Sequence, residues 1–450
     1  MIIDEKEMQK FISESVSQES LKKWSDAFEN GNLDFYDTGY KVCFLNSLAL
    51  KYSELVAEGD AINVLCRTNK NAYRPVYYYL YALHVYENDL AKSFYFEDNV
   101  IKGIYVNLGN EYMRQFRLFE ALECYNKAIC IDPNFGLAYF NRALCKEKFS
   151  NARFYFNVYA CFNEISNDLK QDMGFTEDEE LAHNEYVLKY KNIGEKLIIK
   201  NPSLLQCKFG LYKSPHYCFS HWALINGLFL NPINSFGYYR QAKIDKILDL
   251  GLPLEQKEQL AEIFEYYIFL REKLFVIREG GNDKQIRESL EIFKGLYSIF
   301  DKIAFVIAKA FKLNMNEDVV NFRNIWKNSL GLLEIKNVYL YELYWLQQEY
   351  CPRKKSGTSD INVNRLLAPE YREYVDLRNR IEHKVEKICN MEFEKIYKKT
   401  LSLMKVIRIA ILNLNWLLYD EQNPALYDSN GKRNKNMFFL PEILWPIDAN

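Results

Sequence analysis

A long helical repeat in the second half of the chain most strongly limits what this sequence can fold into. Apolar side chains recur there at alternating steps of four and three residues: Ile286, Leu290, Phe293, Tyr297, Phe300, Ala304, Ile307 and Phe311. Such spacing places them along one stripe of an α-helix, which must be buried against other helices. We therefore expect a helix over about 283–311 that forms one seam of a helical bundle.

Start and stop signals predict further helices on both sides of this one. Pro253 and Pro369 suit a first helical turn, Asn337 suits an N-cap, and the pair Gly280-Gly281 ends a helix. The expected helices cover about 253–279, 337–350, 369 to at least 383, and 391–418. A charged pair, Asp301 and Lys302, interrupts the apolar seam. Burial of charge requires a partner, so the pair is either structural, which we favour, or part of a site.

The first 95 residues also read as helices. An acidic amphipathic helix is expected from about Met8 to Phe28, with Gly31 as its stop. A dense stripe of tyrosines follows within residues 72–94. At this spacing, aromatic side chains more often form a helix–helix core than a platform on which bases stack.

Residues 102–135 resemble a tetratricopeptide repeat of 34 residues. The matching positions are Tyr105, Leu108, Gly109, Tyr112, Ala121, Tyr125, Ala128 and Pro133. A second, weaker unit begins at Gly136, with Tyr139 in the aromatic position but Arg142 where leucine is usual. The resemblance implies a short solenoid whose groove binds a protein or peptide, although the repeats could instead only brace the rest of the chain. If they are separate regulators, deletion of residues 1–170 leaves the chemistry of the second half intact.

Composition divides the chain into five regions. Residues 201–252 are rich in helix-breaking proline and glycine and also in aromatic side chains, which indicates an ordered irregular strap rather than a loose linker. The expected regions are 1–95, N-terminal helices; 96–200, tetratricopeptide-like repeats and following helices; 201–252, the strap; 253–420, a helical bundle; and 421–450, a C-terminal tail with an apolar end. The fold class is therefore all-α, a helical solenoid followed by a bundle.

Charge and cysteine usage exclude several classes of protein. The net charge is −2 and the pI is about 6.3, so any nucleic-acid contact needs a local basic patch. The ten cysteines have no metal-ligand spacing, which predicts reduced thiols in a cytoplasmic protein with no metal and no cofactor. The N-terminus has no signal pattern, and no run reaches about 18 apolar residues, so no membrane partner is expected.

One short stretch, Leu377 to Lys384, carries the strongest candidate for chemistry. His383 is one of only five histidines in the chain, and Arg378 precedes it by five residues. On a helix, Asn379 and His383 lie within about 40° of each other. Arg378 lies roughly 140° from His383, but its long side chain can reach the same space.

This stretch resembles the Arg-x4-His signature of the HEPN superfamily, in which asparagine often follows the arginine, as Asn379 does here. Four blocks, 298–304, 321–326, 339–345 and 377–384, follow the order of a bacterial HEPN branch in which the domain comes after tetratricopeptide repeats. The motif at 228–234 is also similar to that branch, and the resemblance covers roughly residues 100–420. Val385 stands where one subgroup has a tyrosine that a partner nucleotidyltransferase modifies, so that form of control is not expected.

The resemblance implies a HEPN helical bundle at 253–420, a homodimer with two motifs in one cleft, and a metal-independent endoribonuclease of toxin-like or phage-defence type. The residue types fit this chemistry. His383 is a base that titrates near neutral pH, Arg378 can clamp a phosphate, and Asn379 can orient either. RNA would be held by Arg380, Lys384 and the loop residues Arg353, Lys354 and Lys355.

Two alternatives remain open at this stage. Arg378 could pair with Asp376 or Glu382 on its own helix, which would leave His383 as a helix-face residue without catalytic work. The whole chain could also be a catalytically inactive scaffold or RNA-binding module. In that case the repeats hold a partner and the bundle serves dimerisation.

Overall fold

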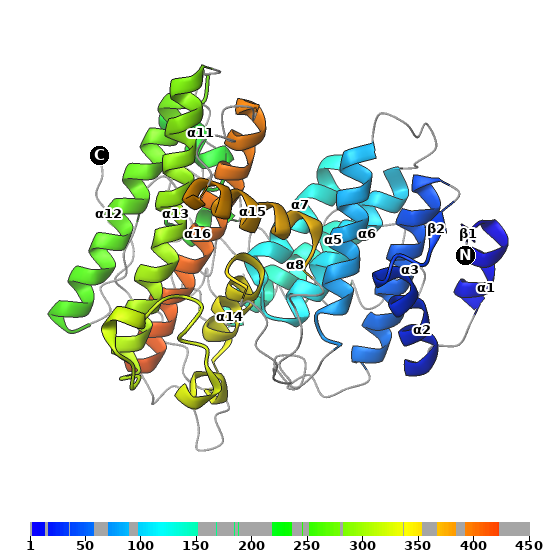
Figure 1. Ribbon diagram of the computed structural model, residues 1–450, viewed down its shortest axis with the longest axis horizontal. Coiled ribbons are helices and arrows are strands. Elements are labelled where there is room, and N and C mark those ends of the chain that lie inside the picture. The colour runs from blue at the N-terminus through cyan, green and yellow to red at the C-terminus, as the bar shows by residue number, and fades with distance from the viewer. Residues whose placement is uncertain are drawn as a thin grey trace.

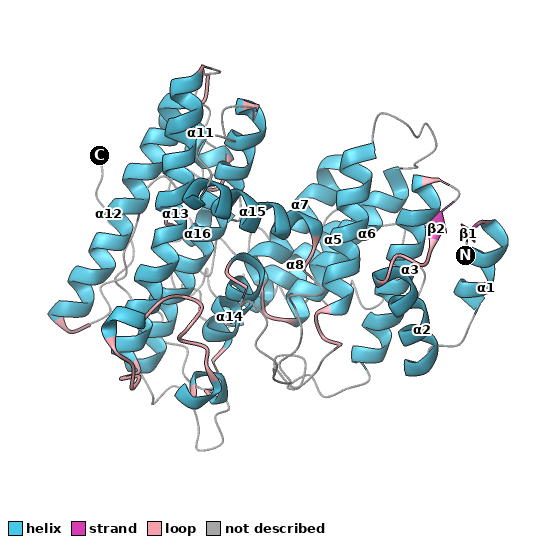
Figure 2. Cartoon of the chain, viewed as in Figure 1, coloured by secondary structure: helices cyan, strands magenta, loops and turns pink. Residues whose placement is uncertain are grey.

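The computed structural model describes residues 2–13, 17–35, 37–57, 71–89, 98–151, 218–235, 252–279, 282–335, 337–352, 367–383 and 392–422, together with residues 168, 184, 188 and 245. Within these residues the chain is all-α apart from a two-residue parallel pairing of β1 (Ile2–Ile3) with β2 (Asp34–Phe35) (Figure 2). The N-terminal helices occupy one end of the elongated molecule and the long bundle helices occupy the other (Figure 1).

Seven helices form the described part of the N-terminal half, and consecutive helices from α3 onward pack against one another. They are α1 (Glu5–Ser13), α2 (Gln18–Glu29), α3 (Thr38–Ala57), α5 (Arg74–Asp89), α6 (Asp98–Arg114), α7 (Leu118–Ile131) and α8 (Gly136–Asn151). The expectation of one helix from Met8 to Phe28 is wrong. Ser17 starts a separate helix, because its extended backbone lets its hydroxyl accept the Ser20 N–H.

The tyrosine stripe of α5 forms helix–helix core, as expected. Tyr77, Tyr78 and Tyr79 are buried. Tyr78 stacks on Tyr52 of α3 with a ring separation of 5.7 Å, and its hydroxyl donates to Glu29 at 2.7 Å. These three rings are buried in helix–helix contacts, so they offer no platform on which bases could stack.

The α6–α7 hairpin depends on a missing side chain. A Cβ atom at Gly109 would lie 2.6 Å from the ring of Tyr125, so only glycine permits this close helix approach. In α8, Arg142 occupies the position where leucine was expected. Its guanidinium binds Asp168 at 2.7 Å and Asn126 at 2.6 Å. A partner residue later in the chain therefore compensates for the departure from the repeat pattern.

Five helices form the C-terminal bundle: α12 (Leu254–Ile277), α13 (Asp283–Ala310), α14 (Val338–Tyr350), α15 (Pro369–His383) and α16 (Phe393–Gln422). Short 3-10 turns join α13 to α14, namely η4 (Glu317–Val319), η5 (Asn328–Leu330) and η6 (Leu332–Glu334). The predicted starts are confirmed: Asn337 caps α14 through its side chain, and Pro369 opens α15. The 283–311 seam is α13, which packs between α12 and α16.

Helix α16 is long and apolar enough to cross a membrane, which the sequence estimate did not anticipate. However, 78% of its most apolar window is buried inside the protein. It packs against α12, α13 and α14, so its apolar surface is already covered as in the core helix of a bundle.

The described part of the strap contains α11 (Phe219–Ile225) and η2 (Pro232–Ser235) and is held by two buried arginines. Arg271 of α12 donates to the Leu228 carbonyl at 3.0 Å and binds Asp245 through two hydrogen bonds. Arg408 of α16 donates to the carbonyls of Phe229 and Asn231 at 2.5 and 2.7 Å. Burial lowers the pKa of Arg408 to about 10. Backbone carbonyls therefore take the place of a side-chain carboxylate at this arginine.

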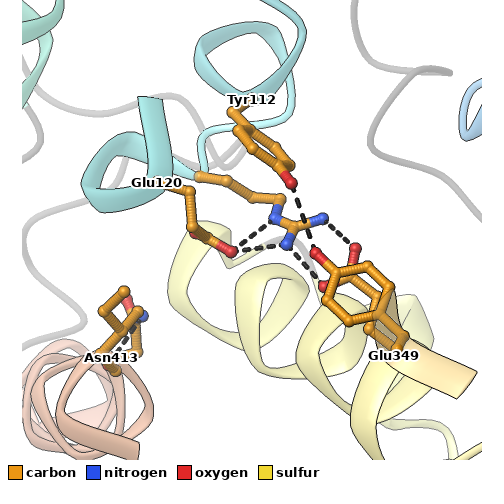
Figure 3. A network of polar contacts seen from close by, with 7 residues as sticks. Tyr112, Glu120, Glu349 and Asn413 are labelled. Atoms are coloured by element: carbon orange, nitrogen blue, oxygen red, sulfur yellow. Dashed lines mark hydrogen bonds and ion pairs between the residues drawn. The ribbon is translucent and has the colours of Figure 1, made fainter. Parts of the chain in front are cut away.

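A second buried arginine network joins the N-terminal helices to the bundle (Figure 3). Arg117, at the start of α7, binds both carboxylate oxygens of Glu349 in α14 at 2.7 Å and also binds Glu120. The ring of Tyr112 covers the guanidinium at 4.4 Å. Close by, Tyr73 of the N-terminal half stacks on Trp345 of α14. A deletion of residues 1–170 would remove Arg117, Tyr112 and Tyr73 and leave Glu349 and Trp345 of α14 without these partners. Such a deletion therefore does not cleanly separate two functions.

Candidate functional site

Helix α15, which carries the motif, lies between the two halves of the protein. It packs against α13 and α14 on one side and against α5 on the other. Buried Tyr371, Tyr374 and Leu377 form its inner stripe. Tyr374 stacks on Phe293 of α13, and the Tyr371 hydroxyl lies 3.4 Å from that of Tyr112. Both halves of the molecule therefore determine where the motif is held.

Arg378 leaves α15 on the side that faces α13. Its side chain is half-buried, and the guanidinium lies over the ring of Tyr297 at 5.2 Å from the ring centre. A partly exposed guanidinium beside an aromatic ring is a residue type that suits contact with a phosphate.

A hollow of about 100 Å³ lies between α13 and α15 beside this arginine. The side chains that border it are Phe293, Lys294, Tyr297, Ser298, Asp301, Arg378 and Ile381. A water molecule needs about 10–15 Å³ of such space, whereas whole drug-sized ligands fill about 300 Å³ or more. The hollow therefore has room for one small group and not for a complete nucleotide.

The charged pair in α13 has two separate roles. Lys302 forms an ion pair with Glu262 of α12. Asp301 accepts the backbone N–H of Phe322 at 2.9 Å and also borders the hollow. The favoured structural interpretation holds for Lys302, but for Asp301 it is incomplete, because this carboxylate belongs to the wall of the candidate site as well.

Cys351 is the buried thiol on which the charge of Arg378 acts. Arg323 donates to the Cys351 carbonyl at 3.4 Å. Burial raises the pKa of Cys351 to about 12 and Asp301 adds to that rise, while Arg378 and Arg323 oppose it. The thiol is therefore protonated at neutral pH and is not a nucleophile.

Of the other predicted site residues, the structure describes the side chains of Asn379 and Arg380, and neither borders the hollow. Asn379 and Arg380 are exposed on α15, turned away from the side that Arg378 occupies. His383 is the last residue of α15, and its side chain lies outside the described part of the structure. Lys384 and the loop residues 353–355 also lie outside the described residues. Within one copy of the chain, Arg378 and Asn379 therefore point in different directions.

Histidines elsewhere in the described chain do not form a competing site. His84 of α5 interacts with Asn88 one turn later, and burial lowers its pKa. His221 lies in α11. His183 and His216 lie outside the described residues. Among the residues that the structure describes, no group of three His, Cys, Asp or Glu side chains could hold a metal ion.

Sequence reasoning missed the contribution of α13 to the site. Tyr297 was recognised only as part of the apolar seam and Ser298 only as the first residue of the block 298–304, and Lys294 was not recognised at all. The one available signal was Asp301, because a carboxylate that interrupts an apolar stripe must be satisfied by some partner. The pattern could not show that Asp301 and Arg378 border the same hollow.

The fold and the candidate site define a class of protein, an all-helical bundle in which the helix that carries the arginine–histidine motif packs against the longer helix α13. Residues 284–421 match the family model of the LA2681-like HEPN domain, and this part of the chain is such a domain. The match begins in α13 and ends in α16, so it includes the motif helix. It does not reach the N-terminal half, and the tetratricopeptide assignment there stays a prediction. No curated protein and no solved structure matches the chain.

Proposed function

We propose that the protein is a metal-independent endoribonuclease whose site is formed by Arg378, Asn379 and His383 from two copies of the chain. HEPN domains are often ribonucleases, and they typically dimerise and bind RNA. The observation that carries the proposal is the position of Arg378. Within a HEPN domain it lies on an aromatic ring at the edge of a hollow, where a phosphate can approach it.

The proposed reaction uses the 2′-hydroxyl of the RNA as its nucleophile. His383 takes the hydroxyl proton, and the oxygen forms a bond to the adjacent phosphorus. The bond from phosphorus to the 5′-oxygen breaks, and that oxygen receives a proton from the partner's His383. The products are a 2′,3′-cyclic phosphate and a 5′-hydroxyl. Arg378 stabilises the charge that develops on the phosphorane oxygens, and Asn379 orients the histidine or the phosphate.

A dimer solves a geometric problem in this scheme. Arg378 faces α13, whereas Asn379 is exposed on another side of α15. One copy therefore presents the phosphate clamp and the motif asparagine to different regions of space. A two-fold axis beside α15 would bring the outer face of one motif helix to the arginine of the other.

The biological role follows from the same resemblance. We infer a bacterial toxin-like or phage-defence effector in the cytoplasm, controlled by a protein or peptide that binds the tetratricopeptide-like surface around α6, α7 and α8. The Gly109–Tyr125 contact supports a tight helical hairpin of the kind that such repeats use. Exposed Arg380, together with Lys384 and residues 353–355, would supply local contacts to RNA phosphates.

The decisive experiment compares the wild-type chain with His383→Ala in a bacterial host. We expect growth arrest and fragmented RNA with the wild type, and normal growth and intact RNA with the variant at equal protein level. The purified enzyme should cleave in EDTA and leave 2′,3′-cyclic ends, and it should not cleave DNA. Cleavage that needs a divalent ion, or that persists in His383→Ala, would place the chemistry away from His383. A purified wild type that cleaves no RNA would favour the alternative of a catalytically inactive scaffold or RNA-binding module.

A further inference from the structure

We propose that the hollow between α13 and α15 is a base subsite that prefers guanine in the nucleotide next to the cleaved bond. This inference rests on the proposed function for its biological setting, since it names the sequence that the ribonuclease selects. Its physical basis is separate from catalysis. It depends on the polar groups of α13, none of which has a part in the proposed reaction.

The size and position of the hollow favour a single base. About 100 Å³ beside Arg378 admits one small planar group. Single-stranded RNA is usually read by bases that are splayed out and stacked on aromatic rings or arginine planes. The Tyr297 ring supports one face of the Arg378 guanidinium. The Tyr297 ring and the Arg378 guanidinium both border the hollow, so a base that enters it has two planar groups to pack against.

The polar groups on the wall separate into acceptors and donors. Asp301 is one acceptor, because a carboxylate has about four lone-pair sites and the Phe322 N–H uses only one of them. Ser298 is a second, because its hydroxyl proton is already donated to the Gly295 carbonyl at 2.7 Å. The ammonium of Lys294, which is exposed at the rim, is a donor only.

Guanine matches this arrangement better than the other bases. Its pairing edge carries two adjacent donors, N1–H and the 2-amino group, beside one acceptor, O6. The donors suit Asp301 and Ser298, and O6 suits Lys294. Uracil has a single N–H between two carbonyl oxygens, which would place an acceptor against the carboxylate. A phosphate in the hollow is disfavoured for the same reason, since it would meet the charge of Asp301.

Binding can be measured without cleavage by using the full chain with His383→Ala. The probes are a short fluorescent oligouridine and the same oligomer with one central guanosine, compared by anisotropy. We expect the guanosine oligomer to bind about tenfold more tightly, as one good base contact typically provides. Asp301→Asn keeps an oxygen for the Phe322 N–H but presents an amino donor to the hollow, so it should remove most of this preference.

Two further variants make the test specific. Asp318→Asn removes a carboxylate from the exposed η4 turn and should leave the preference unchanged. Lys294→Met leaves the Phe322 contact intact and should reduce the preference even if Asp301→Asn fails to fold. Equal binding of the two oligomers by the parent chain would overturn the proposal, as would a preference that survives both Lys294→Met and a folded Asp301→Asn.

The same data distinguish this inference from the proposed function. A wild-type chain that binds the guanosine oligomer preferentially but cleaves no RNA would refute the ribonuclease and leave the subsite. A chain that cleaves RNA at all sequences, with no change in Asp301→Asn, would refute the subsite and leave the ribonuclease.

Discussion

Two arginines in this protein, Arg117 and Arg378, have opposite surroundings. Arg117 is fully buried, and two carboxylates occupy its fork from two directions. Arg378 is half-buried, lies on a tyrosine ring and borders a hollow that is open to solvent. Both residues connect distant helices, but only the second has a face that a ligand can reach.

The difference separates architecture from chemistry. Burial alone would lower the pKa of Arg117, yet Glu120 and Glu349 raise it well above its ordinary value. Such an arginine is committed to its partners and fixes how α7 meets α14. Arg378, by contrast, is only half-buried, and its guanidinium lies beside an aromatic ring and a hollow rather than between two carboxylates. This comparison is open to experiment at four places.

The largest effect is expected at the junction. Arg117→Met leaves buried Glu349 and half-buried Glu120 without their counter-charge, and breaking a buried ion pair in this way typically costs about 3–5 kcal/mol of folding free energy. Chemical denaturation should show this loss, and any RNA cleavage should fall with the folded fraction. Combining Arg117→Met with Glu349→Leu removes one of the two carboxylates that the first change leaves unpaired. The double variant should therefore regain part of the stability. A single variant that melts like the wild type would mean that the network does not hold the halves together.

The corresponding change at the candidate site, Arg378→Ala, should reduce activity rather than stability. Arg378→Ala should reduce the cleavage rate by about 10²–10⁴, the range for a charged group that acts on the transition state. Its melting temperature should stay close to that of the wild type, because Arg378 is partly open to solvent. Arg378→Lys keeps the charge without the fork and should recover little activity. Asn379→Ala should reduce cleavage less. Loss of stability without specific loss of activity would place Arg378 with Arg117 as a structural residue.

A smaller effect is expected in the hairpin that carries Arg117. Gly109→Ala places a methyl group 2.6 Å from the Tyr125 ring and should cost about 1–3 kcal/mol. Gly103→Ala, in the same helix, meets nothing within 4 Å and should stabilise by up to about 1 kcal/mol. Thermal melts of the two variants check this contrast. Equal melting temperatures would show that the α6–α7 contact is looser than described.

The last expected effect concerns pH. Burial, and then the adjacent Glu120, raise the pKa of Glu342 well above its ordinary value of 4.5. The native state then binds a proton that the unfolded chain releases above about pH 4.5. Stability from this group is complete below that pH and falls as pH rises toward the raised pKa, by at most about 1.4 kcal/mol per pH unit. Glu342→Gln should flatten this dependence. The stability of the variant relative to the wild type should therefore be highest at alkaline pH. Parallel stability curves for the two proteins would contradict it.

Much of the helical framework could be predicted from local patterns. The 4-3 spacing from Ile286 to Phe311 located α13, and Asn337 and Pro369 marked the starts of α14 and α15, because these signals act within one or two turns. Ser17 was missed as a helix start because a serine inside an amphipathic pattern is a weak signal. The HEPN resemblance could likewise be seen from spacing along one helix, and the family match confirms it for residues 284–421. The roles of Arg378, Asn379 and His383 stay predictions.

The sequence by itself therefore determined the all-α fold class, the positions of the main helices and the presence of a HEPN domain in the C-terminal part of the chain. Only the tertiary structure decided which arginine became structural and which remained accessible. Arg117 meets Glu349 across 232 positions of the chain, and Arg378 meets Tyr297 across a helix interface that no local repeat encodes. The physical reason is that an isolated helix determines only which side of itself is apolar. The partner of a charge, and the space left beside it, exist only after the helices have packed.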